Sequence, residues 1–327
     1  MKKKYRCFAL FSGGLDSMLA ARLMQDLGYE VIPVFFRTPF FEPDQARQAA
    51  AHIGFKLLVI DISAEHLQML GNPRYGFGKN FNPCIDCHAL MFHRAGEMMP
   101  EYAVDFLISG EVVGQRPMSQ RPDALNAVGK LSGYKDLLIR PLSQKLLPDT
   151  LPIREGWVDK EKMLAIQGRG RSRQMEMART WGITSYRHPG GGCLLTDVVF
   201  SRKLRDLIKY GQLNLQQVEL LKYGRHFRLS AGVKLIVGRH EQDNDNLQAL
   251  AEGLVVLQTP ALPGPLAVMN TSEIPPTALL QMAAGLLLRY NNKIIGKVQV
   301  NYGIWPHTDN ILSAEALSSD EVEEYRI

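Results

Sequence analysis

The first half of the chain alternates short apolar runs with amphipathic stretches. Five apolar runs have the length and composition of β-strands, at residues 5–11, 31–36, 57–62, 106–109 and 137–139. Between them, apolar residues recur at helical spacing in residues 18–27, 43–53 and 87–99. Alternating strands and helices are typical of an α/β fold, so we expect a doubly wound, mainly parallel sheet.

The pattern changes beyond about residue 213. Short apolar runs lie on either side of a polar turn in residues 234–247, followed by an apolar helix over 276–290 and a strand near 297–300. This pattern predicts a smaller α+β domain. At 327 residues the chain also exceeds what one core usually fills. We therefore expect a domain over 1–200, a basic connector over 201–224 and a second domain over 225–327.

Charge is unevenly distributed. The net charge is +5, but residues 164–234 hold thirteen Lys and Arg against four Asp and Glu. Such a region indicates a polyanionic partner, although a solvated charged face would give the same count. The chain is 46% hydrophobic without a run long enough for a membrane span, so we expect a cytoplasmic protein with no membrane partner.

The turn Ser12-Gly13-Gly14-Leu15-Asp16-Ser17 joins the first strand to the first helix. Glycines let a ligand approach the main chain, and N–H groups at a helix N-terminus bind phosphate oxygens. Hydroxyls at both ends add donors, and Asp16 can orient a metal or cap the helix. A plain strand–turn–helix connection would explain the glycines alone, so we interpret the whole set as a phosphate site.

Three of the four cysteines form a second pattern. Cys84 and Cys87 make a C-x-x-C, and Cys193 follows the three glycines 190–192. Three interpretations stay open: a zinc site completed by His88, persulfide chemistry, or an iron–sulfur cluster with one open iron. Four cysteines are too few for a disulfide scaffold, and Cys7 within the first strand is expected to be a core residue.

These motifs resemble a known superfamily. The turn at residues 12–17 resembles that of the PP-loop ATP pyrophosphatases, which implies ATP cleavage between the α- and β-phosphates and adenylation of an oxygen. The stretches ISGEVVGQRPMSQ (108–120) and LLIRPL (137–142) resemble tRNA 4-thiouridine synthetases, and NPCIDCH (82–88) is similar to bacterial tRNA 2-thiouridylases. The resemblance spans roughly residues 5–200.

The resemblance implies roles for individual residues. ATP phosphates would lie against Ser12, Gly13, Gly14, Asp16 and Ser17. The nucleotide and substrate cleft would be lined by Gly110, Glu111, Gly114 and Gln115. Cys84, Cys87 and Cys193 would match the three cysteine ligands of [4Fe–4S]-dependent tRNA thiolases, and with Asp16 they make up the expected catalytic set.

RNA contacts are expected from the basic region and the second domain. Arg169, Arg171 and Arg173 fall at spacings that cluster on a helix, and Arg202 and Lys203 continue the band. KLIVGRHEQDNDNL (234–247) resembles the signature of the NFACT-type RNA-binding domain, which adds Arg239.

The sequence therefore predicts an ATP-dependent tRNA uridine sulfurtransferase that uses ATP, Mg²⁺ and a [4Fe–4S] cluster, with zinc as the lesser alternative. Its partners would be tRNA and a sulfur donor, either free sulfide or a cysteine desulfurase or sulfur carrier, with a homodimer as a possible assembly. The alternatives are a persulfide relay, an amine nucleophile in place of sulfur, and a non-catalytic RNA-binding protein with structural zinc. The target uridine and the modified atom, at position 2 or 4, stay open.

Overall fold

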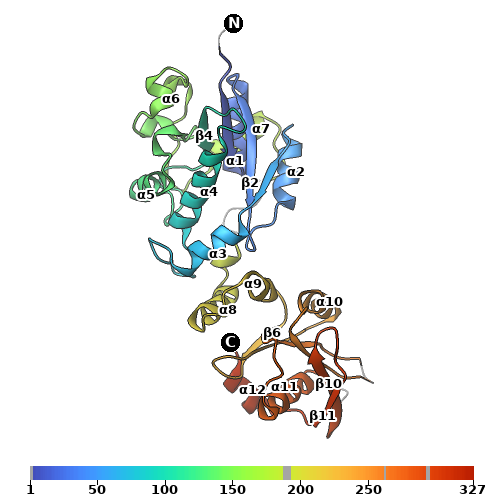
Figure 1. Cartoon of the computed structure of the whole chain (residues 1–327). Coiled ribbons are helices and arrows are strands. Elements are labelled where there is room, and N and C mark those ends of the chain that lie inside the picture. Colours follow the sequence, from blue (N-terminus) through green and yellow to red (C-terminus); the bar gives the residue numbers. More distant parts are fainter. Residues whose placement is uncertain (1–2, 187–192, 261–262, 292–294) are drawn as a thin grey trace. The chain divides into compact units, whose positions relative to one another are not determined.

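The computed structural model describes residues 3–186, 193–260, 263–291 and 295–327. The chain forms two compact units, residues 1–196 and 197–327 (Figure 1). Within the described ranges, no helix combines the length and the apolar character needed to cross a membrane.

The first unit is built on a five-stranded parallel sheet. Its strands are β1 (Arg6–Leu10), β2 (Glu30–Arg37), β3 (Leu58–Asp61), β4 (Phe106–Ser109) and β5 (Leu138–Ile139). Their order in the sheet is β3-β2-β1-β4-β5, and every neighbouring pair is parallel. The predicted doubly wound α/β fold is confirmed, and all five predicted strands are present.

Helices connect these strands. They are α1 (Leu15–Asp26), α2 (Asp44–His52), α3 (Ser63–Gly71), α4 (Cys84–Met98), α5 (Pro122–Ser132), α6 (Leu151–Arg154) and α7 (Ser172–Thr180). The helices expected over 18–27, 43–53 and 87–99 correspond to α1, α2 and α4. Helix α4 starts three residues earlier than predicted, at Cys84, and the carbonyl of Pro83 already accepts the Cys87 N–H at 2.9 Å.

Helices cover both faces of the sheet. Successive side chains along β1 point to opposite faces, so each face has apolar residues to bury. Cys7 and Ala9 pack with α1 and α2 in one hydrophobic cluster, while Phe8 packs with α4 in another. Cys7 is fully buried, as expected for a core residue. Figure 1 shows α4 and α5 beside β4, and α2 on the other side, beyond β2.

The strand order reverses between β1 and β4, and this determines where a ligand can bind. Leu10 pairs with Ser109 at the carboxyl ends of these two strands. The chain leaves β1 into the Ser12–Ser17 turn and leaves β4 into Gly110. In open α/β sheets, ligands bind at the carboxyl edge next to such a reversal.

The second unit has a six-stranded antiparallel sheet. The strands are β6 (Arg225–Arg228), β7 (Lys234–Val237), β8 (Val255–Gln258), β9 (Ala267–Met269), β10 (Val298–Ile304) and β11 (Asn310–Ala314), in the order β11-β10-β8-β9-β7-β6. Its helices are α8 (Val198–Lys209), α9 (Leu215–Leu220), α10 (Glu241–Leu250), α11 (Thr277–Arg289) and α12 (Ser319–Tyr325). The predicted α+β character is confirmed.

Helices pack on both faces of this second sheet. One face carries a cluster that includes Leu235, Leu257 and the buried side of α11. The opposite face carries Ile236 and Val256, packed with residues of α9 and α10. Residues 201–224, expected as a connector, lie inside the second unit as most of α8 and all of α9.

Candidate active site

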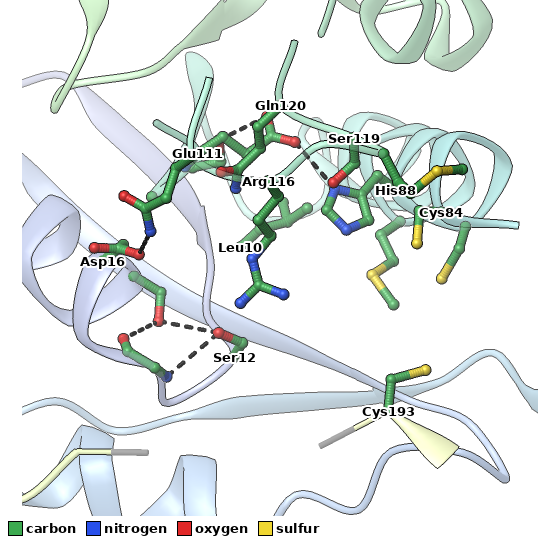
Figure 2. A pocket seen from close by; sticks show the side chains of 18 of the residues that line it. Leu10, Ser12, Asp16, Cys84, His88, Glu111, Arg116, Ser119, Gln120 and Cys193 are labelled. Atoms are coloured by element: carbon green, nitrogen blue, oxygen red, sulfur yellow. Dashed lines mark hydrogen bonds and ion pairs between the residues drawn. The ribbon is translucent and has the colours of Figure 1, made fainter. Parts of the chain in front are cut away.

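A cavity of about 650 Å³ lies at the carboxyl edge of the first sheet, where the strand order reverses (Figure 2). It is lined by the Ser12–Ser17 turn, the start of α4, the segment after β4, Arg169 and Arg171, and the stretch from Cys193 to Thr196. Phe35, Phe36 and Phe41 supply an apolar wall. The cavity therefore combines polar turns with an apolar surface that an aromatic base can contact.

The turn before α1 is held by its own hydroxyls. Ser17 Oγ donates to the Gly14 carbonyl at 2.8 Å and lies 3.3 Å from Ser12 Oγ, which accepts the Gly14 N–H at 3.3 Å. The N-cap residue of α1 is Gly14, so no N-cap side chain occupies the first N–H groups of the helix. The first N–H groups of this helix are therefore available to an anion in the cavity.

Gly13 brings the turn close to helix α2. It has φ +73°, and a Cβ at this position would lie 2.8 Å from Ala46 Cα in α2. Gly14 lines the cavity directly. Gly13 therefore lets the turn pack against α2, and its expected contact with ATP stays a prediction.

The Asp16 carboxylate is held by a chain of two amides. Gln115 Nε2 donates to Asp16 Oδ2 at 2.6 Å, and Gln174 Nε2 donates to Gln115 Oε1 at 2.8 Å. Among the described residues, Asp16 Oδ1 is buried without a hydrogen-bond partner. Burial raises the pKa of Asp16. The Gln115 hydrogen bond and the charges of Arg171 and Arg116 act to lower the pKa but do not cancel the effect of burial. The unpartnered oxygen fits a cation such as Mg²⁺, which is often bound by one or two carboxylates together with substrate phosphates.

Gly110 brings the segment after β4 against this turn. A Cβ at Gly110 would lie 2.4 Å from the carbonyl carbon of Asp16 and 2.5 Å from Ser17 N. All of these neighbouring atoms belong to the backbone and cannot rotate away. Gly110 is therefore required for the close contact between the two segments that frame the cavity.

We expect Gly110→Ala to lower the free energy of unfolding by about 1–3 kcal/mol, because the added methyl overpacks a rigid contact. ATP binding should weaken as well, since the Asp16 backbone must shift. Urea unfolding and calorimetric ATP titration measure the two effects. Gly170→Ala is the matched control, because a Cβ there meets nothing within 4 Å. Equal behaviour of the two variants would contradict the close contact.

Glu111 is the centre of a buried ionic network. Its Oε2 accepts from Arg140 Nε at 2.8 Å and from Ser109 Oγ at 3.1 Å, and its Oε1 lies 3.0 Å from His88 Nδ1. Burial acts to raise the pKa of Glu111, but Arg140 and His88 outweigh it and lower the pKa to about 2. Glu111 lines the cavity as expected, and its carboxylate orients His88 and Arg140.

The three expected thiols lie on the same cavity. Cys84 and Cys87 occupy the first turn of α4, and Cys193 lies across the cavity from Cys84, just before a short 3₁₀ helix, Leu194–Thr196 (Figure 2). Among the described residues, none of the three forms a disulfide. The preceding glycines 190–192, expected to form a bare collar, lie outside the described residues.

Neighbouring polar groups contact two of these thiols. Asn82 Nδ2 donates to Cys84 Sγ at 2.9 Å, and His66 Nε2 lies 3.3 Å from Cys87 Sγ. Burial raises the pKa of both thiols, and for Cys87 the negative charges of Cys193 and Cys84 raise it further. These thiols therefore favour the protonated form unless a cation joins them.

The donor set is suited to a metal centre, although the geometry is incomplete. Three sulfur ligands around one cavity match the chemistry of an iron–sulfur cluster or of zinc. Over the ranges that the structure describes, no three His, Cys, Asp or Glu side chains are arranged around a single metal position. The expected fourth zinc ligand, His88, uses Nδ1 for Glu111 and retains Nε2.

Arg116 is the main cavity residue that the sequence analysis missed. Its guanidinium points into the cavity between the Ser12 turn and Cys84 (Figure 2), and it has no ion-pair partner among the described residues. Its charge opposes the burial effects on the pKa of both Asp16 and Cys84. The signal was present in the stretch GQR, where Arg116 directly follows Gln115.

His66 and Arg140 were missed for a different reason. His66 is fully buried, and burial lowers its pKa to about 4, so it is neutral beside Cys87. Arg140 reaches Glu111 from a segment 29 residues away. Neither pairing has a local sequence pattern, because the partners meet only through the fold.

The six basic residues expected to bind RNA fall into two groups. Arg169 and Arg171 line the cavity in the loop before α7, whereas Arg173 is exposed on α7 and pairs with Glu176 at 2.8 Å. The remaining three belong to the second unit. Arg202 is exposed on α8, Lys203 donates to the Leu221 carbonyl at 3.1 Å, and Arg239 pairs with Asp243 at 2.6 Å.

Comparison with known proteins gives two kinds of match. Residues 224–326 match the NFACT protein RNA binding domain family. The bifunctional protein NifU/MnmA of Rubrobacter xylanophilus is 28% identical over 162 residues, which covers 44% of this chain and 32% of that protein. The tRNA-specific 2-thiouridylase MnmA of Nitratiruptor sp. is 33% identical over 109 residues, covering 30% of this chain and 32% of that enzyme.

The matching region is partial in each case. The chain spans about a third of the length of these curated relatives. A 4-thiouridine synthetase solved with RNA and bound ATP is 18% identical and covers 56% of this chain and 54% of its own, with a TM-score of 0.36. A TM-score this low does not establish a shared fold. The sequence matches nevertheless confirm the resemblance that the motifs predicted: this chain is similar to the PP-loop tRNA thiouridylases, and its residues 224–326 are similar to the NFACT RNA-binding domain.

Proposed function

We propose that this protein is an ATP-dependent tRNA uridine sulfurtransferase. The observation that carries the proposal is the meeting of two chemistries in one cavity. A helix N-terminus suited to phosphate and three cysteine side chains, one of them far from the other two in the sequence, line the same space. A nucleotide-binding protein has no need of the thiols, and a redox or zinc protein has no need of the phosphate turn.

ATP would bind with its phosphates on the Ser12–Ser17 turn. The uncapped N–H groups of α1 and the Ser12 hydroxyl face the cavity as donors, and Asp16 Oδ1 would hold a Mg²⁺ ion bound to the phosphates. Arg116, Arg169 and Arg171 add positive charge to the lining. The apolar wall would take the adenine or the uracil ring.

Two steps complete the proposed chemistry. The uridine carbonyl oxygen attacks the α-phosphorus of ATP, so that pyrophosphate leaves and an O-adenylated uridine forms. Sulfide then adds to the activated carbon, the carbon–oxygen bond breaks, and AMP departs with the former carbonyl oxygen. Arg116 lies between the phosphate turn and Cys84, where it can stabilise negative charge in both steps.

Cys84, Cys87 and Cys193 are the residues that would hold a [4Fe–4S] cluster, with zinc as the lesser alternative. A bound cluster with three cysteine ligands leaves one iron able to hold sulfide. In the persulfide alternative, the terminal sulfur of a Cys–S–SH group attacks the activated carbon. A second cysteine then releases the product by forming a disulfide, which an external thiol must reduce.

The RNA partner is proposed from the second unit as well as from the cavity. Residues 224–326 are similar to a family of RNA-binding domains. Arg202 on α8, outside the matched residues but in the same unit, is exposed. tRNA also provides the uridine that the proposed reaction needs. The sulfur donor would be free sulfide or a carrier protein.

The proposal is tested with anaerobically purified full-length protein, ATP, Mg²⁺, sulfide and tRNA from cells that lack the gene. We expect thiouridine by mass spectrometry of tRNA nucleosides, with one AMP released per sulfur inserted. Omission of ATP should abolish the product. Iron content and visible absorbance of the same protein distinguish the cluster from the persulfide route.

Other outcomes would identify the alternatives. ATP cleavage to AMP without sulfur in the RNA would favour an amine nucleophile. Neither AMP nor thiouridine, with intact tRNA binding, would indicate a non-catalytic RNA-binding protein. If iron-free protein forms thiouridine and a persulfide can be trapped on it, the persulfide route is supported and the cluster route is contradicted.

A further inference from the structure

The segment between α3 and α4, residues 72–83, carries aromatic and basic side chains that the proposed chemistry does not use. It projects from the end of the first unit (Figure 1) and contains no Asp or Glu. Tyr75 is 48% exposed, and Arg74 and Lys79 are exposed as well. Neither cation has an ion-pair partner among the described residues. We call residues 72–83 the aromatic loop.

The C-x-x-C motif itself fixes the backbone of the aromatic loop. Asp86, between the two cysteines in sequence, is only 4% exposed. Its Oδ1 accepts the Arg74 N–H at 2.7 Å, and its Oδ2 accepts the Tyr75 N–H at 3.0 Å. The helical turn that carries Cys84 and Cys87 therefore also determines where Arg74 and Tyr75 present their side chains.

Further contacts join the aromatic loop to the cavity mouth. Asn80 Nδ2 donates to the Thr196 carbonyl at 2.9 Å, three residues after Cys193. A Cβ at Gly78 would lie 3.0 Å from Cε of Met118, which lines the cavity. The loop thus contacts the chain next to all three thiols.

The interior of the loop is itself ordered by aromatic packing. The rings of Phe77 and Phe81 stack with their centroids 3.8 Å apart and an angle of 8°. Phe81 adopts φ +65°, a left-handed conformation that non-glycine residues seldom take. Such conformations persist only where the surroundings impose them, and they are frequent at ligand-binding sites.

We propose that the aromatic loop holds the RNA beside the target uridine, with Tyr75 stacking on an unpaired base and Arg74 and Lys79 contacting flanking phosphates. This inference rests on the proposed function for its RNA substrate. A uridine that reacts in a closed cavity must leave its stack, which exposes the adjacent bases. Single-stranded RNA is recognised by aromatic platforms together with cations. The aromatic loop has two cations without an ion-pair partner in the part of the chain that the structure describes, and it has no carboxylate of its own. It therefore suits phosphate better than a protein surface.

The test compares Tyr75→Ala with Tyr75→Phe in the full-length protein, using tRNA from cells that lack the gene as the probe. We expect Tyr75→Ala to weaken tRNA binding about 5- to 150-fold in filter-binding assays, the range for losing one stacked base. Tyr75→Phe keeps the ring and should stay within about twofold of the wild type. ATP binding should not change, because Tyr75 does not line the cavity.

The two cations are tested through the salt dependence of binding. Arg74→Ala and Lys79→Ala should each make the slope of log K against log salt shallower by about 0.7, as expected for one lost single-strand phosphate contact. Lys56→Ala is the matched control. Lys56 is exposed and precedes β3, so it lies at the amino edge of the sheet, away from the cavity.

Several results would overturn the inference. These are a Tyr75→Ala variant that binds tRNA like Tyr75→Phe, or a wild-type protein that binds no tRNA. The Tyr75→Ala variant could also bind tRNA normally and lose thiolation only when a carrier protein supplies the sulfur. That result would mean that the loop binds the carrier protein instead of RNA. Tyr75-dependent tRNA binding without any thiouridine would support the loop and contradict the proposed function. Normal thiolation by Tyr75→Ala would support the proposed function and contradict the role of the loop.

Discussion

Cys87→Ser is expected to lower tRNA thiolation on the order of a thousandfold or more, the scale of losing a residue on which the chemistry depends. The thiol of Cys87 lies on the cavity, 3.3 Å from His66 Nε2, and serine can keep that polar contact while removing the sulfur. ATP binding should stay within about twofold, because the phosphate turn is a separate part of the lining. Nucleoside mass spectrometry and calorimetric ATP titration measure the two quantities.

Cys7→Ser is the matched control for loss of a buried thiol. Cys7 is fully buried in β1 and faces the hydrophobic core. This variant should lose some stability and retain thiolation in the fraction that folds. If Cys87→Ser thiolates tRNA like the wild type, Cys87 takes no part in sulfur transfer. Loss of ATP binding in the same variant would indicate general damage to the cavity.

Glu111→Ala should lower the free energy of unfolding of the first unit by about 3–5 kcal/mol, because it leaves the buried Arg140 guanidinium without its carboxylate. The side chains of Glu111 and Arg140 are 6% and 9% exposed. Urea unfolding measures the effect. Tryptophan fluorescence reports on the first unit alone in a Trp305→Phe background, because the other two tryptophans, Trp157 and Trp181, belong to that unit.

Glu161→Ala is the matched control for this ion pair. Glu161 pairs with Lys145 at 3.1 Å but is 85% exposed, so its loss should cost at most about 1 kcal/mol. A similar, small cost for both glutamates would mean that the Arg140 pair contributes no more than a surface pair.

The Glu111 network also predicts a dependence on pH. Because the pKa of Glu111 falls from its ordinary value of 4.5 to about 2 in the folded state, its ionised form favours folding. The stability difference between the wild type and Glu111→Gln should therefore be constant above about pH 4.5. It should shrink as the pH falls from there toward 2.

The sheet was predictable because buried parallel strands are short apolar runs, and β1 and β4 are such runs. Helix α3 was missed because it begins two residues after β3 ends, with no glycine or proline between them to mark a boundary. The thiols and the phosphate turn could be inferred because their residue types and spacings are local signals. The partners of Glu111 and Cys87 could not be inferred from the sequence, because Arg140 and His66 reach them from distant segments.

The arginines show a further limit of local patterns. Arg169, Arg171 and Arg173 look alike in sequence and were all expected on one RNA-binding helix. Helix α7 begins only at Ser172, so the first two lie in a loop that lines the cavity. The third is exposed on the helix and pairs with Glu176. Arg171 and Arg173, two residues apart on either side of the helix start, are thus a cavity residue and a surface residue.

The residues named as cavity lining all belong to the first unit, from Ser12 to Thr196. In evolutionary terms, the reactive groups are then inherited as one block, while the part of the chain that resembles an RNA-binding family is a separate block. If the proposals hold, a lineage could exchange the second block and change part of the RNA recognition without altering the cavity. The aromatic loop would stay with the thiols, because Asp86 of the C-x-x-C motif holds its backbone.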